Sequence, residues 1–312
     1  MTDSHIHLTY HSFDGTFSYI DLENSAFVRK ENGTREKLIE RMKESGIGFC
    51  IEPAIDLDSN RDVLALAEKM PGFVYPAVGL HPTRTYQSLS ADSSGNVRPE
   101  RVKLHAFRKI RKYAENPLVI AIGETGLDYH CARKDQHRII QKIWFVRQLR
   151  LADKLALPVI YHIREADRDA LKILRRFRGR LHGGVYHCFH GDAETAKIYT
   201  GLGLAIGIGG MILQDPEKCR EIDDAVRQTP IENILIETDG PFVLPDFECA
   251  SKKQRQKTRN TSMILPGVAQ RIAEIKGMTR EEVEKITAEN AARIFGIVSD
   301  REREIISAGW KE

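Results

Sequence analysis

Eight short apolar runs, rich in β-branched residues, recur along this 312-residue chain, and stretches with helical periodicity separate them. This alternation is typical of βαβ units, in which a helix carries the chain back to the start of the next parallel strand. Eight units are the number that closes a parallel sheet on itself. We therefore predict an α/β fold, a (β/α)8 TIM barrel. The predicted strands end at residues 4–7, 49–52, 77–81, 121–124, 158–162, 184–187, 204–207 and 235–239.

Helical patterns occupy the gaps between these strands, and one more follows the eighth unit. It opens at Thr279 with Glu281 and Glu282, whose charges suit a helix N-terminus, so we expect an extra C-terminal helix. The predicted domain is a barrel over residues 1–298, followed by a charged tail over 299–312. Long loops over 9–33 and 83–98 should lie on the barrel rim. The predicted barrel helices cover 35–45, 60–70, 99–115, 135–155, 166–177, 193–200, 216–228 and 265–275.

The composition indicates a folded, reduced protein outside the membrane. Hydrophobic residues make up 41% and charged residues 29%, which supplies a full core. There is no signal-peptide pattern at Met1 and no apolar run of membrane-spanning length, so we expect a cytoplasmic location and no membrane association. The five cysteines are far apart and form no CxxC, which favours mostly buried thiols over disulfides or structural zinc. A net charge of +3 is too small to imply nucleic-acid binding by itself.

Histidines and acids concentrate where the predicted strands end. Because the carboxyl ends of parallel barrel strands share one face, side chains far apart in the sequence should meet at one mouth. Imidazole and carboxylate groups are metal ligands, and the sequence therefore predicts a metal centre there. The residues concerned are His5, His7, His81, Glu124, His162, His187 and Asp239.

Each member of this set has an ordinary interpretation when it is taken alone. His5 and His7 are two apart on a strand and so face the same side, but such a pair can also be hydrogen-bonded core. Glu124 stands near Gly123 and Gly126, which allow close backbone approach, and a solvated rim acid is the alternative. Asp239 precedes a Gly-Pro break and could bind metal, accept a proton or cap a turn. The occurrence of all these residues at the ends of predicted strands favours a metal site over the separate interpretations.

The number of donors favours two ions over one. Four histidines and two carboxylates exceed the four ligands of a tetrahedral zinc, and zinc, manganese, iron and magnesium all stay open. Two divalent ions about 3.5–4 Å apart lower the pKa of a bound water and clamp the attacking and leaving oxygens. Hydrolysis of a phosphodiester needs both effects.

With these residues identified, the sequence resembles the TatD family of metal-dependent deoxyribonucleases within the amidohydrolase-like barrels. The resemblance runs over nearly the whole chain, and its motifs are specific in combination. They are residues 3–8 (DSHIHL), 78–82 (VGLHP), 122–129 (IGETGLDY), 162–166 (HIREA), 187–191 (HCFHG) and 237–241 (ETDGP), with Asn290 and Phe295 closing the set.

The resemblance implies a role for each residue of the predicted centre. One ion would be held by His5, His7, Glu124 and Asp239, and the second by Glu124, His162 and His187. Glu124 would be shared, and Asp239 would also accept the proton of the attacking water. His81 and Arg164 would face the substrate, Arg164 with a guanidinium fork that suits a phosphate. The implied substrate is DNA, single-stranded or damaged, cut either 3'-5' from an end or at damage.

The chain departs from the family pattern at three places. The first is the long insertion after His7, which is unusual and could narrow or cover the mouth. His190 stands where a small residue is usual, as an additional ligand or a rim residue. The family's Arg-Asn-Glu-Pro is here Arg259-Asn260-Thr261-Ser262, which affects substrate preference and loop rigidity but not the predicted ligands.

A local run of positive charge follows the eighth predicted strand. Residues 252–259 hold five basic side chains and no acid, and Lys252, Lys253 and Arg255 are predicted to contact substrate phosphates. Most charge runs are solvated surface, so the position on the reactive face is what favours binding.

Two other functions remain open at this point. One is an amidohydrolase or lactonase that acts on a small ester or amide with the same metals. The other is a non-catalytic binding protein, which six metal-ligating side chains at one rim disfavour. A monomer is the expected oligomeric state.

Overall fold

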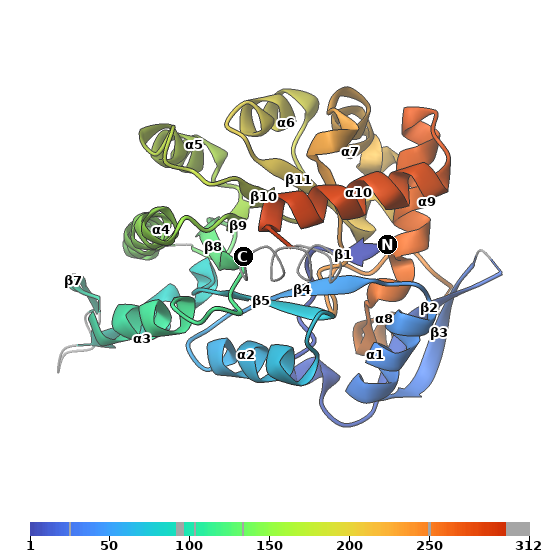
Figure 1. Cartoon of the computed structure of the whole chain (residues 1–312), viewed down its shortest axis with the longest axis horizontal. Helices are drawn as coiled ribbons and strands as arrows, with labels where there is room; N and C mark the ends of the chain where they lie inside the picture. The colour runs from blue at the N-terminus through green and yellow to red at the C-terminus, as the bar shows by residue number, and fades with distance from the viewer. Residues whose placement is uncertain (25, 92–96, 103, 133, 249–250, 298–312) are drawn as a thin grey trace, which may run out of the picture.

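Eight parallel strands form one sheet in the computed structural model, which describes residues 1–24, 26–91, 97–102, 104–132, 134–248 and 251–297. The strands follow one another in the sheet in the same order as along the chain, and the helices surround them (Figure 1). The strands are β1 (Thr2–Asp3), β4 (Phe49–Pro53), β5 (Val74–Val78), β8 (Ala121–Asp128), β9 (Val159–Arg164), β10 (Gly184–Tyr186), β11 (Ala205–Ile208) and β12 (Ile234–Ile236).

Residues that continue the first and last strands join the two edges of this sheet. The Ser4 amide donates to the Ile236 carbonyl at 3.1 Å, and the His7 amide donates to the Gly240 carbonyl at 2.8 Å. Ile6 and Gly240 form a parallel bridge between these two contacts. The sheet is therefore closed, and the predicted TIM barrel is confirmed.

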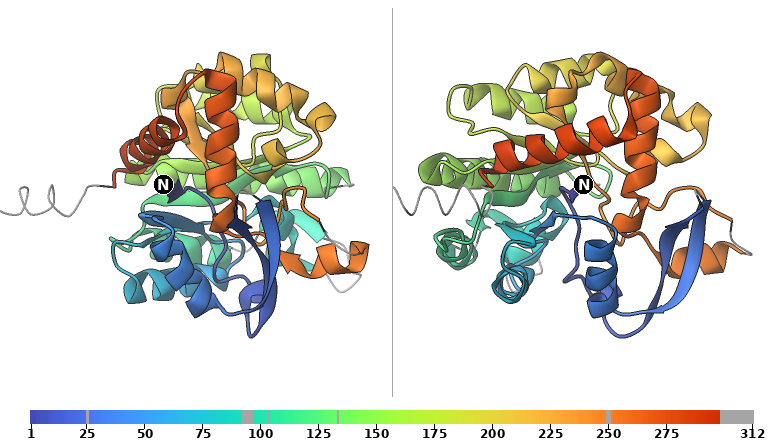
Figure 2. Two further views of the ribbon diagram at one scale, coloured as in Figure 1. Left: turned by 90° about the vertical axis from the view of Figure 1, so that its right-hand side faces the viewer. Right: turned by 45° about the vertical axis from the view of Figure 1, so that its right-hand side comes forward.

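Ten α-helices are present in the described part of the chain, and Figure 2 shows them packed around the strands from two further sides. None of them is both long enough and apolar enough to cross a membrane. Their bounds are α1 (Arg35–Glu44), α2 (Ser59–Lys69), α3 (Leu104–Ala114), α4 (Asp135–Leu155), α5 (Asp167–Arg176), α6 (Ala193–Thr200), α7 (Pro216–Gln228), α8 (Lys252–Lys257), α9 (Leu265–Lys276) and α10 (Arg280–Phe295).

The last helix, α10, is the predicted extra helix, and it closes one end of the barrel. Thr279 caps it in a capping box: its hydroxyl accepts from the Glu282 amide, and the Glu282 side chain accepts from the Thr279 amide. Ala291 and Phe295 of α10 pack in one cluster with the inward residues of seven strands, Ile51, Ala77, Ala121, Ile160, Val185, Ala205 and Leu235. The opposite end, where the strands terminate, stays available for a site.

The segment over residues 9–33 is not the loop that the sequence predicted. It holds the short 3₁₀ helix η1 (His11–Phe13) and an antiparallel hairpin of β2 (Phe17–Glu23) and β3 (Ala26–Gly33). A distant strand, β13 (Thr258–Arg259), extends this hairpin by parallel pairing with β2. Phe17 and Ile20 are buried beneath it, so packing fixes the segment as sheet.

The prediction for residues 83–115 is wrong in part. The 3₁₀ helix η2 (Pro82–Ser88) leads into the small sheet of β6 (Leu89–Ala91) and β7 (Val97–Val102). Residues 99–102 therefore belong to a strand, and the helix begins only at Leu104. The predicted tail over 299–312 lies outside the described residues.

Four of the five cysteines lie in the described part of the chain, and Cys50, Cys188 and Cys219 are free thiols. Cys50 and Cys219 are buried, whereas Cys188 is partly exposed and Cys131 is exposed. The expectation of mostly buried thiols therefore holds for two of these four.

Candidate metal centre

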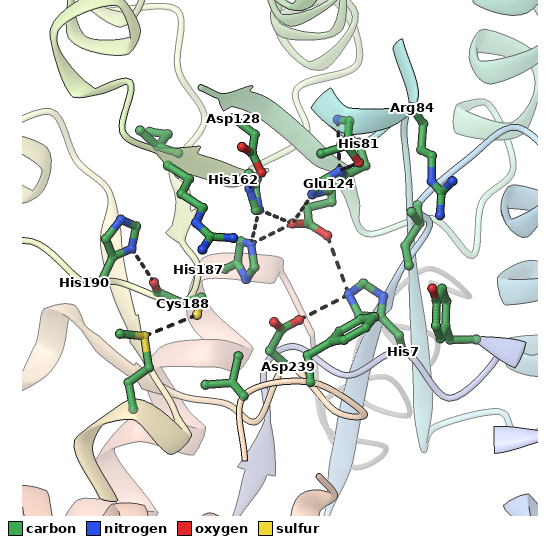
Figure 3. Close-up of a pocket in the computed structure, with 18 of the residues that line it drawn as sticks. His7, His81, Arg84, Glu124, Asp128, His162, His187, Cys188, His190 and Asp239 are labelled. Carbon is green, nitrogen blue, oxygen red and sulfur yellow. Dashed lines mark hydrogen bonds and ion pairs between the residues drawn. The ribbon is translucent and has the colours of Figure 1, made fainter. Parts of the chain in front are cut away.

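A cavity of about 580 Å³ opens at the carboxyl ends of the barrel strands. Figure 3 shows polar side chains from several strands that point into it. Six of the seven residues predicted to meet at the mouth line this cavity, and His5 lies buried beside them. The six are His7, His81, Glu124, His162, His187 and Asp239, and Arg164 lines the cavity as well.

One group of donors lies on the barrel seam, which is the junction between residues 4–7 after the first strand and residues 236–240 at the end of the last strand. The Nε2 atoms of His5 and His7 are 3.1 Å apart, and each lies 3.6 Å from Oε2 of Glu124. Oδ1 of Asp239 lies 3.6 Å from Nε2 of His5 and 3.4 Å from Nε2 of His7. Ligands about 2.1 Å from a tetrahedral ion are about 3.4 Å from one another. The donor atoms of His5, His7 and Glu124 therefore already have about the mutual spacing that one ion requires, and Asp239 lies beside the two imidazoles.

A second group surrounds the other oxygen of the same carboxylate. Oε1 of Glu124 lies 2.6 Å from Nε2 of His187, 2.8 Å from Nδ1 of His162 and 3.4 Å from Nε2 of His81. The two ring nitrogens of His162 and His187 are 3.0 Å apart. The two oxygens of Glu124 thus face two separate sets of imidazoles, as a carboxylate shared by two ions would.

Glu124 lies within β8 and not at its end, because β8 continues to Asp128. The two glycines beside it are needed for the approach of β9. A Cβ on Gly123 would lie 2.7 Å from Cβ of Ile160, and a Cβ on Gly126 would lie 1.9 Å from the His162 carbonyl oxygen. The predicted close approach of the backbone at these glycines is therefore confirmed, and it lets Glu124 and His162 meet.

Burial and neighbouring charge set the protonation of these groups. Burial lowers the pKa of His5 to about 3, together with the positive charge on His187, so His5 is a neutral donor. Burial opposes protonation of His7 and His162 as well, but the carboxylates of Asp239, Asp128 and Glu124 outweigh it and raise both pKa values to about 9. Protons on these two rings compensate the buried carboxylates, a role that divalent cations can take over. The donor set therefore fits the metal centre that the sequence predicted.

The model for TatD related DNases matches residues 2–296 of the chain. The chain belongs to the TatD family. An uncharacterised metal-dependent hydrolase, YabD of Bacillus subtilis, is 32% identical over 263 residues, which cover 84% of this chain and 92% of that protein. The 3'-5' ssDNA/RNA exonuclease TatD of Erwinia amylovora is 31% identical, and the match covers 89% of this chain and 98% of that one.

A solved structure supports the same assignment. The crystal structure of YJJV, a TatD homologue from Escherichia coli K12, has a TM-score of 0.75 and 26% identity, with 96% of this chain and 98% of that chain covered. The family assignment makes this TatD protein a metal-dependent hydrolase, and candidate ligand groups for the metal are present in its barrel.

Asp128 is part of this site, although the sequence analysis did not select it. Its Oδ2 lies 3.2 Å from Nε2 of His162, and its Oδ1 accepts from the Cys131 amide at 2.7 Å. If His162 donates through Nε2 to this carboxylate, its Nδ1 is left with a lone pair that faces Glu124. The spacing was a usable signal: residues 124 and 128 are four apart in one strand and so share a face.

Three further buried acids accept hydrogen bonds from segments next to the site residues. Each of the three lies in a strand or at its end. Asp3 accepts from the Thr238 hydroxyl at 2.7 Å and from the Ser262 hydroxyl at 2.7 Å. Glu52 accepts from the amides of Leu8 and Thr9 just after His7. Glu237 accepts from the Cys188 amide, and a Cβ on Gly207 would lie only 2.2 Å from its Oε2. The absence of a side chain at Gly207 of β11 therefore makes room for the Glu237 carboxylate.

The family-pattern departures have structural roles. The Thr261 hydroxyl donates to the Ile20 carbonyl of β2 at 2.7 Å, and Ser262 donates to Asp3, so hydrogen bonds hold this loop. His190 lies on the cavity rim, where its Nδ1 is 3.0 Å from the Cys188 carbonyl oxygen. Among the described residues, His190 belongs to none of the candidate metal groups.

The predicted substrate-side residues fall in two places. His81 and Arg164 line the main cavity, and Nε2 of His81 is close enough to Glu124 to join the second donor group. Lys252 and Arg255 of α8 line a neighbouring cavity of about 490 Å³. Lys253 is exposed on α8 and lines neither of these two cavities.

Proposed function

We propose that this TatD protein is a two-metal phosphodiesterase that removes nucleotides from the 3' end of single-stranded DNA. The observation that carries the proposal is the position of Glu124, whose two oxygens each face a separate set of imidazole nitrogens. His5, His7, Glu124 and Asp239 would hold one divalent ion, and Glu124, His162 and His187 would hold the second. When bound, such ions activate a water and neutralise charge on a phosphate.

Asp239 is the group that we assign to proton transfer. Burial alone would raise its pKa, but the hydrogen bond with His7 and the charges of the neighbouring histidines lower it, so the carboxylate is ionised and able to accept a proton. Its backbone φ of 54° is unusual for a residue other than glycine and aims its side chain at the seam donors.

Glu124 supplies negative charge between the two imidazole groups. Burial opposes its ionisation, yet the charges of His187 and His81 and hydrogen bonds with His162 and His187 hold its pKa well below the usual range. It is therefore a carboxylate at neutral pH and suited to bridging two cations.

The substrate class follows from the cations around the mouth. Arg164 forms no ion pair with any described residue and lines the main cavity, so its guanidinium is available to a phosphate oxygen. Lys252 and Arg255 extend the positive charge along one side. Relatives named as 3'-5' ssDNA/RNA exonucleases support the direction of cleavage.

The test is cleavage of an end-labelled single-stranded oligonucleotide with magnesium or manganese. Asp239→Asn should lower kcat by about 1,000-fold or more because the proton acceptor is lost, while Glu248→Gln, which removes an equal but exposed charge nearby, should retain activity. Absence of cleavage with every divalent metal, or full activity of Asp239→Asn, would refute the proposal.

The same preparations distinguish the small-molecule alternative. Replacement of Lys252, Lys253 and Arg255 by Ser should weaken oligonucleotide turnover and flatten its salt dependence, since phosphate contacts are lost. Efficient hydrolysis of a small ester or amide, unchanged in this variant and without DNA cleavage, would favour an amidohydrolase or lactonase.

A further inference from the structure

Phe242 forms a wall between the main cavity and its basic neighbour. The first cavity, of about 580 Å³, holds the candidate metal donors, and the second, of about 490 Å³, is lined by Lys252, Arg255 and Arg259. Phe242 and Val243 line both. The two spaces therefore adjoin along one aromatic side chain.

The exposure of this ring is unusual in the molecule. Within the part of the chain that the structure describes, only three large hydrophobic side chains are exposed: Leu118 at 40%, Ile139 at 47% and Phe242 at 39%. Phe242 alone of these lines the main cavity. An exposed aromatic ring at the mouth of a site suits the stacking of a planar group.

Phe242 is also held in place. Its amide donates to the Asp239 carbonyl at 2.8 Å, which closes a tight turn between the two residues. Asn260 braces this turn by donating from Nδ2 to the carbonyls of Thr238 at 2.7 Å and Val243 at 3.1 Å. The Tyr10 ring packs against the Phe242 ring with centroids 5.1 Å apart. A group stacked on Phe242 would thus stand at a fixed distance from Asp239.

The second cavity carries charge that suits phosphate. Arg259 is oriented by its bonds to the carbonyls of Ser12 and Gln256, and among the described residues neither it nor Lys252 forms an ion pair. The charge of Arg255 is partly neutralised by Asp246, whose Oδ1 lies 3.6 Å from Nη2 of the guanidinium. Aromatic platforms combined with a basic groove are how proteins bind single-stranded nucleic acid, because every base offers a face and every linkage a phosphate.

We propose that the second cavity is a subsite for the nucleotide next to the scissile one. Its base stacks on Phe242, and its phosphate lies against Lys252 and Arg259. A duplex offers no free base face to Phe242, so this subsite selects a single strand. The inference rests on the proposed function, since the nucleotide in the main cavity is the one that is cut.

The experiment compares a mononucleotide 5'-methyl phosphodiester, which has no second nucleotide to place in the second cavity, with a hexanucleotide that carries the same 3' nucleotide. In the metal-loaded wild type, kcat/KM should be larger for the hexanucleotide. Phe242→Ala should lower the ratio of the two kcat/KM values about 10-fold, as expected for the loss of one stacked base, and Phe242→Trp should preserve it. Leu118→Ala, an equally exposed apolar residue that lines neither cavity, is the matched control.

A binding measurement gives a second readout. A phosphorothioate hexanucleotide with 2-aminopurine at the second position from the 3' end should lose fluorescence on the wild type and keep it on Phe242→Ala. If Phe242→Ala fails to fold, Lys252→Ser, whose side chain is exposed, should still lower the length ratio and reduce its salt dependence.

The outcomes separate the two proposals. Equal length dependence in the wild type and Phe242→Ala, or unquenched 2-aminopurine on the wild type, overturns the subsite while the nuclease assignment stands. Failure of the wild type to cut any oligonucleotide overturns the proposed function and the subsite with it.

Discussion

Asp128→Asn should weaken the binding of one metal ion and leave the other nearly unchanged. The Asp128 side chain is only 3% exposed and lies 3.2 Å from Nε2 of His162. Burial would raise its pKa, but the hydrogen bond with His162 and the one from the Cys131 amide bring it to about 2, so the group is a carboxylate. It fixes His162 with Nδ1 toward Glu124 and the second donor group.

The expected magnitude follows from this geometry. Loss of a carboxylate that orients a metal-ligating histidine typically costs 10–100-fold in metal affinity. A 30-fold loss corresponds to about 2 kcal/mol. No hydrogen bond or ion pair joins Asp128 to the seam donors His5, His7 and Asp239, so the affinity for an ion held by these three should change by about 2-fold or less.

Calorimetric titration of metal-free protein with Mn²⁺ or Zn²⁺ measures the two affinities separately. Glu165→Gln is the matched control, because it removes a charge that lines the same cavity but is 62% exposed and, among the described residues, pairs only with His130. Equal affinities in Asp128→Asn and Glu165→Gln, or an equal loss at both sites, would refute this role of Asp128.

Two further predictions concern protons and the support of the site. Because His7 and His162 have pKa values of about 9 in the metal-free protein, they are protonated at pH 7 and must release these protons to bind metal. Apparent metal affinity should therefore rise between pH 7 and 9 by up to ~10-fold per pH unit for each proton released. Calorimetric titration in buffers of different ionisation enthalpy measures the affinity and the number of protons released. A pH-independent affinity would contradict this prediction. Ser262→Ala removes one hydrogen bond from the fully buried Asp3 and should lower the free energy of unfolding by about 1.5–3 kcal/mol in urea. A loss under about 0.5 kcal/mol would contradict that assignment.

The sequence could predict which side chains come together because barrel topology converts strand order into proximity. His5, Glu124 and His187 are far apart in the chain, yet each belongs to or follows a strand of the same closed sheet. The rule that the carboxyl ends of parallel strands lie on one face of a barrel was sufficient to predict that these side chains are close together. The same rule could have selected Glu52 and Glu237, which also stand at strand ends.

The hairpin could not be predicted in the same way. The segment over 17–33 is rich in polar and turn residues, and the buried residues Phe17, Ile20 and Asp21 of β2 do not follow the period of two that marks a half-buried strand. Its pairing with β13 joins Ser18 to Thr258, a contact between residues 240 apart. Local composition carries no signal of such a partner, so tertiary pairing decided the structure.

The barrel seam has a consequence for how the protein matures. The amides of Ser4, His7 and Asp239 donate the hydrogen bonds that join residues 4–7 to residues 236–240. A nascent chain that has emerged only as far as β11 already has the five imidazoles of the site and pairs β1 with β4, but it lacks β12 and Asp239 on the other side of the first strand. The seam donor set is therefore complete only after translation has passed Asp239, so an ion held there would stabilise the closed sheet late in biosynthesis.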